Sequence, residues 1–177
     1  MKPKGFLRAG FLSAALFFSL FFTVEASTSV SATALLLPDS TEASVAGNDE
    51  QRIFSLINRE REKNGLGELR WQNDLARLAR AYSEKMAREN FFSHFERDGA
   101  SVADRARESR IKNWHKIGEN LFYCLGVREY DRFAVQNWMK SETHRRNILD
   151  RRLTATGIGL ARSREGKIYV TQVFIED

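Results

Sequence analysis

Helical hydrophobic periodicity dominates the middle of this chain. From residue 49 onward, apolar side chains recur every three to four positions between charged ones, until Asn64-Gly65, a pair typical of a left-handed helix end. A second apolar stripe follows Asn73, a candidate N-cap, and predicts a helix over 74–90. A third stripe predicts a helix over about 129–141. The chain is therefore expected to contain at least three amphipathic helices.

The C-terminal part of the chain changes from helical to strand-like patterning. Residues 156–161 and 168–174 read as strands, and Arg164-Glu165-Gly166 between them suits a hairpin turn. Two further elements complete the prediction: a strand over 117–125, and a short helix over 101–108 opened by a capping-box-like pair, Ser101 and Asp104. Helices followed by a hairpin indicate an α+β fold, with helices packed on an antiparallel sheet.

The N-terminus has the pattern of an export signal. A basic start precedes an uncharged apolar run over 9–24, and small residues offer cleavage after Ala26 or after Ala34. The alternative is an uncleaved anchor, but the run is shorter than the roughly 20 residues that span a bilayer. We therefore expect a signal peptide over 1–26, a Ser/Thr/Ala-rich linker over 27–48 and one folded domain over 49–177. The expected protein is secreted (extracellular or periplasmic), with no stable membrane span after signal removal.

Charge and cysteine content narrow the function classes. The net charge of +5 becomes +3 without residues 1–26, because that segment holds three Lys or Arg and one Glu. Basic and acidic residues are interleaved, so no basic block indicates nucleic acid as a partner. Cys124 is the only cysteine, which excludes an intramolecular disulfide. It could pair between molecules or act as a nucleophile, but its apolar neighbours favour a buried structural thiol with a raised pKa.

Three short motifs carry the candidate chemistry. They are Phe91-Phe92-Ser93-His94, Gly118-Glu119-Asn120 and the segment 138–149, which contains His144; two of the three histidines of the chain lie in them. Taken singly, each is ordinary: a histidine packed behind Phe91 and Phe92, a solvated loop glutamate and an exposed histidine. Together, over about residues 50–174, they resemble the bacterial SCP-like extracellular branch of the cysteine-rich secretory, antigen and pathogenesis-related (CAP) superfamily.

The resemblance implies a fold and a site. The fold would be a three-layer α-β-α sandwich with a central antiparallel sheet. In the family, two histidines and two glutamates converge in one cleft, and His94, Glu119 and His144 match three of these positions. Ser141 stands where the helix glutamate would be, so the cleft residues expected here are His94, Glu119, His144 and Ser141.

Two neutral imidazoles and one carboxylate resemble an open zinc site, so His94, Glu119 and His144 are the candidate metal ligands and Zn²⁺ the candidate cofactor. No catalytic residue is assigned, because no Ser-His-Asp or Cys-His arrangement can be assembled and the acid at position 141 is missing.

Three functions remain open from the sequence. We favour a non-enzymatic binding or interaction module for an unknown cell-envelope or extracellular ligand, with a cleft that takes a divalent cation. The first alternative is a metal-dependent hydrolase of envelope or extracellular substrates. The second is a lipid- or sterol-binding protein, which the resemblance allows but no residue demonstrates.

Overall fold

The computed structural model describes residues 40–177, and their side chains from residue 48. The expected signal peptide, both expected cleavage points and linker residues 27–39 lie outside the described residues. Nine elements follow in the order α1 (Ser40–Lys63), β1 (Arg70–Trp71), α2 (Asn73–Glu89), α3 (Val102–Glu108), β2 (Lys116–Cys124), α4 (Tyr130–Lys140), α5 (Glu142–Ile148), β3 (Ala155–Arg162) and β4 (Ile168–Glu176). Helix α1 thus begins inside the segment that was expected to be linker.

The sheet has the strand order β1-β3-β4-β2. Strand β4 pairs antiparallel with β3, which confirms the predicted hairpin, and antiparallel with β2 on its other side. Strand β1 pairs parallel with β3, through Arg70 with Ala155 and Trp71 with Thr156. The sheet is therefore mixed, and the expectation of a purely antiparallel sheet was wrong. The reason is that the chain runs along the edge of β3 for only two residues before α2, too short a stretch to show strand periodicity.

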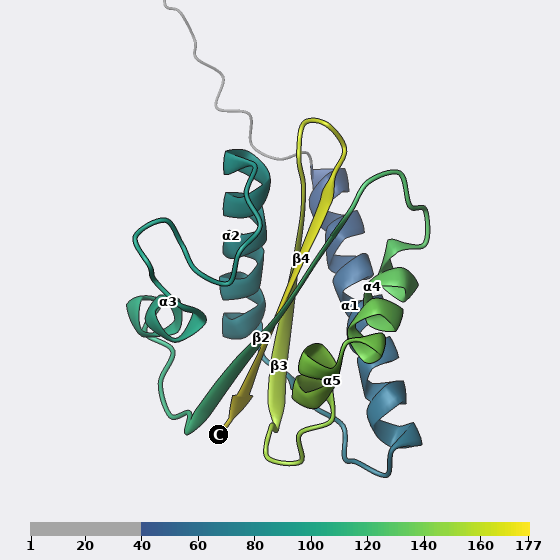
Figure 1. The fold of residues 1–177 in the computed structure, drawn as a ribbon, viewed down its shortest axis with the longest axis vertical. Coiled ribbons are helices and arrows are strands. Elements are labelled where there is room, and N and C mark those ends of the chain that lie inside the picture. Colours follow the sequence, from purple (N-terminus) through teal and green to yellow (C-terminus); the bar gives the residue numbers. More distant parts are fainter. Residues whose placement is uncertain (1–39) are drawn as a thin grey trace, which may run out of the picture. The chain divides into compact units, whose positions relative to one another are not determined.

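Helices cover both faces of the sheet (Figure 1). Helices α2 and α3 lie on one face, and α1, α4 and α5 lie on the other. On the α1 face, Phe122 and Phe174 of the sheet pack with Ile53 and Trp138 of the helices. On the α2 face, Val173 and Ile175 pack with Leu75 and Leu78. This is the three-layer α-β-α sandwich that the family resemblance implied.

Two glycines let α2 lie directly against β3. A Cβ atom on Gly157 would lie 2.1 Å from the backbone nitrogen of Ala76, and one on Gly159 would lie 1.9 Å from that of Arg80. Real Cβ atoms do not approach backbone so closely, so only glycine fits at these positions. The spacing of Gly157 and Gly159 places both on the same face of the strand.

Several local predictions are confirmed. Helix α1 ends before Gly65, which has φ +69°, and α2 ends at Asn90, which has φ +48°. Ser101 and Asp104 form a complete capping box at the start of α3. Cys124 is buried, and burial raises the pKa of its thiol, as its apolar neighbours predicted. None of the helices within residues 40–177 is long and apolar enough to cross a membrane.

Candidate functional site

Glu119 lies at the centre of the candidate site, and its carboxylate has two partners. Its side chain is only 3% exposed. Its Oε1 atom lies 2.8 Å from Nδ1 of His94, and its Oε2 atom accepts a hydrogen bond of 2.5 Å from Arg105. The guanidinium of Arg105 is 6% exposed, so this is a buried ion pair. A buried carboxylate needs such partners, since burying a charge without compensation is costly.

Arg105 also holds the loop that carries His94. Its NH1 group donates to the backbone oxygen of His94 at 3.4 Å, and its guanidinium carbon lies 3.5 Å from the ring centroid of Tyr82. The Tyr82 hydroxyl donates to the backbone oxygen of Ser93 at 2.7 Å. Burial raises the pKa of Tyr82 to about 12, so its hydroxyl remains a donor at neutral pH. Two buried side chains thus position the segment that presents His94.

His144 belongs to α5, which side-chain amides attach to β2. Asn120 Nδ2 donates to the backbone oxygen of His144 at 3.1 Å. Asn147 Nδ2 donates to the backbone oxygen of Glu119 at 3.2 Å and to Asn120 Oδ1 at 2.9 Å. The two asparagines therefore hold α5 against β2 through side-chain to backbone bonds. Burial lowers the pKa of His144, and the charge of His94 lowers it further.

The structure therefore brings His94 and Glu119 into contact and places His144 near them. Ser141 is the junction between α4 and α5: it ends one helix and begins the next. Among the described residues, no side-chain hydrogen bond joins Ser141 to the other three cleft residues. His115, the third histidine, is exposed.

The arrangement fits a direct carboxylate ligand to zinc poorly. Both oxygens of Glu119 are already engaged by His94 and Arg105. Within residues 48–177, no three His, Cys, Asp or Glu side chains are grouped so that they could hold a metal ion. Glu119 instead has the geometry of a residue that orients an imidazole through Nδ1 and leaves Nε2 available, as carboxylates do behind metal-binding histidines.

Exposed aromatic side chains lie beside His94. Phe92 and Phe95 are 46% and 58% exposed, and the Phe92 ring meets that of Tyr123 edge to face at 4.8 Å between centroids. The His94 side chain is itself 48% exposed, so it is not packed behind the preceding phenylalanines. Sequence reasoning missed this aromatic rim and also missed Arg105 and Tyr82. The alternation of β2 could have placed Tyr123 on the Glu119 face, but no signal marked Arg105 as buried.

Comparison with known proteins identifies related chains. The sequence pattern of the Cysteine-rich secretory protein family (CAP) matches residues 54–174. The uncharacterized membrane protein YlbC of Bacillus subtilis is 35% identical over 127 residues, which cover 72% of this chain and 34% of YlbC. The uncharacterized protein YkwD of the same organism is 36% identical over 126 residues, 71% of this chain and 46% of YkwD. The chain thus spans less than half the length of these relatives.

A solved structure of the same fold is also similar. It is an extracellular protein containing an SCP domain from Bacillus anthracis, which is 28% identical and superimposes with a TM-score of 0.70. The similarity covers 80% of this chain and 44% of that protein.

Proposed function

The chain belongs to the cysteine-rich secretory protein (CAP) family, and we propose that it is an exported, non-enzymatic binding module whose ligand contacts the cleft of His94, Glu119 and His144. The observation that carries this proposal is the engagement of Glu119, whose two oxygens are taken up by His94 and Arg105. A general base needs a free lone pair within reach of the substrate proton. Glu119 is only 3% exposed and each of its oxygens already has a partner, so its carboxylate is poorly placed to reach a substrate proton.

The residue at position 141 supports the same conclusion. The family resemblance places a glutamate at this position, where it could act as a second proton-transfer group, and this chain has a serine there. What remains for a ligand is the exposed edge of His94, the half-buried His144 and the aromatic rim. Such a mixture of hydrogen-bonding and apolar groups is typical of binding sites.

We propose that the site takes a divalent cation through two ligands and not three. His94 and His144 would hold the cation, and Glu119 would orient the His94 ring rather than bind the metal. A zinc ion held in this way would polarise an oxygen of the ligand. The export signal expected over 1–26 and the extracellular relative from Bacillus anthracis support a location outside the cell.

Calorimetric zinc titration of the exported protein tests the cation site. We expect binding in the wild type and loss of binding in His94→Ala and in His144→Ala. His115→Ala is the matched control, because His115 is an exposed histidine outside the cleft, and it should bind as the wild type does. Equal heats in all four proteins would refute the proposed cation site.

A separate assay tests the absence of catalysis. The exported protein is offered a panel of ester and peptide substrates, with and without a chelator. We expect no chelator-sensitive turnover. Turnover that disappears both with chelator and in His94→Ala would refute the non-enzymatic proposal and indicate a metal-dependent hydrolase.

A further inference from the structure

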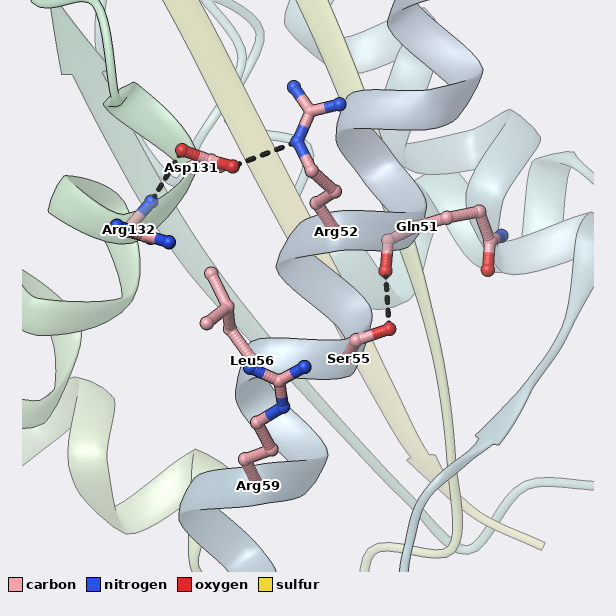
Figure 2. A pocket seen from close by; sticks show the side chains of 7 residues that line it. All are labelled: Gln51, Arg52, Ser55, Leu56, Arg59, Asp131 and Arg132. Atoms are coloured by element: carbon pink, nitrogen blue, oxygen red, sulfur yellow. Dashed lines mark hydrogen bonds and ion pairs between the residues drawn. The ribbon is translucent and has the colours of Figure 1, made fainter.

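A hollow lies away from the His94, Glu119 and His144 site, between α1 and the first turn of α4 (Figure 2). Its volume is about 340 Å³, and it is lined by Gln51, Arg52, Ser55, Leu56, Arg59, Asp131 and Arg132. It shares no residue with the cleft, which is built from β2, α5 and the loop after α2. Three of its seven lining side chains are arginines and one is an acid.

The single acid is neutralised within the hollow. Asp131 Oδ2 accepts a 2.9 Å hydrogen bond from Nε of Arg52, and its Oδ1 accepts from the backbone N–H of Arg132 at 2.8 Å (Figure 2). Arg52 is bound on its other side by Asp49, which is almost fully buried. Arg52 and Asp131 therefore form a structural link between α1 and α4.

Arg59 and Arg132 carry the charge that remains. Among the side chains that the structure describes, no acid forms an ion pair with Arg59. Arg132 has only a 3.5 Å contact with Glu129, and both of these side chains are mostly exposed, so the pair contributes little. In Figure 2 the two guanidinium groups lie on either side of Leu56, which separates them with an apolar surface.

We infer that this hollow is a second binding site, which takes the phosphate group of a small molecule between Arg59 and Arg132. Arginine binds phosphate through paired N–H groups with matching geometry. A phosphate has enough oxygens to receive such pairs from two helices at once, whereas a carboxylate has only two. Leu56 supplies an apolar surface for an organic body attached to the phosphate.

Calorimetric titration at low ionic strength tests the site, with phenyl phosphate and inorganic phosphate as probes. Arg59→Gln and Arg132→Gln should each weaken binding about tenfold, which corresponds to about 1.4 kcal/mol, and the double variant should lose binding. The substituted side chains are exposed, so circular dichroism should show an intact fold. Tighter binding of phenyl phosphate would indicate a phosphorylated organic molecule as the ligand, and tighter binding of inorganic phosphate would indicate the free ion.

The matched control is Arg77→Gln. Arg77 is 68% exposed, lies near the start of a helix and pairs with an acid three residues earlier, Asp74. Arg132 has the same setting in α4, with 64% exposure and Glu129 three residues earlier. The control should bind both probes as the wild type does. The proposal is overturned if neither probe binds, if the double variant binds as well as the wild type, or if Arg77→Gln loses as much affinity.

Discussion

Replacing Arg105 by methionine should destabilise the protein more than any change at an exposed arginine. Methionine keeps most of the side-chain length but removes the guanidinium that faces Glu119. Removing one partner of a buried ion pair typically costs about 3–5 kcal/mol, because the other charge stays buried without compensation. His94 still contacts Oε1 of Glu119 in the variant, so we expect a loss near the lower limit, about 3 kcal/mol.

Urea unfolding followed by circular dichroism measures this loss through the shift in midpoint. The measurement is made on the wild type, Arg105→Met, Glu119→Gln and the double variant. The double variant carries no unpaired buried charge, so it should lose less stability than the sum of the two single losses. We expect a coupling free energy above about 1 kcal/mol between the two positions.

Arg107→Met is the control in the same helix. Arg107 pairs with Asp104, and both side chains are more than half exposed. Exposed pairs contribute about 0–1 kcal/mol, so this variant should unfold close to the wild-type midpoint. Two results would refute the reasoning: a loss in Arg105→Met no larger than in Arg107→Met, or single losses that add without coupling.

Three further outcomes follow from the same structure. Gly159→Ala should lose about 3 kcal/mol of unfolding free energy, the upper end of the usual cost of overpacking, because the new Cβ meets the backbone of α2. Urea unfolding measures this loss, and a wild-type midpoint would disprove the close approach. The raised pKa of Tyr82 makes its neutral form the stable one in the folded state, so its contribution is complete below pH 10 and is lost as pH rises toward about 12. Tyr82→Phe should therefore show a smaller alkaline loss of stability than the wild type, and equal losses would contradict burial of the hydroxyl. In chelator-treated protein, NMR titration should give His144 a pKa below its usual value, and His94→Ala should raise that pKa. An unchanged pKa of His144 in the variant would show that the charge of His94 does not act on it.

Local signals explain why most of the fold could be predicted from the sequence. The left-handed ends at Gly65 and Asn90 and the capping box at Ser101 depend on neighbouring residues only. Helix α5 was not predicted, because within its seven residues only Ile148 is buried and no apolar stripe forms. Its attachment to β2 comes from Asn120 and Asn147, which are distant from one another in sequence.

The candidate site was only partly predictable for a related reason. His94, Glu119 and His144 were found because they match a family pattern, and the structure gives the first two a direct contact. Arg105 and Arg107 look alike in the sequence, yet one is buried against Glu119 and the other is exposed. That difference arises from how α3 packs on the sheet, which periodicity over seven residues does not determine.

Side-chain hydrogen bonds along the two edges of the sheet affect how the protein behaves in concentrated solution. Along the edge formed by β2, Asn147 donates to the backbone oxygen of Glu119, and the Trp138 indole donates to the backbone oxygen of Leu121 at 2.9 Å. On the opposite side, Glu50 accepts a 3.1 Å bond from the backbone N–H of Leu160, beyond the short strand β1. Unpaired strand edges invite pairing with another chain and aggregation. A second copy would first have to break these bonds, so the folded protein resists growing its sheet into a neighbour.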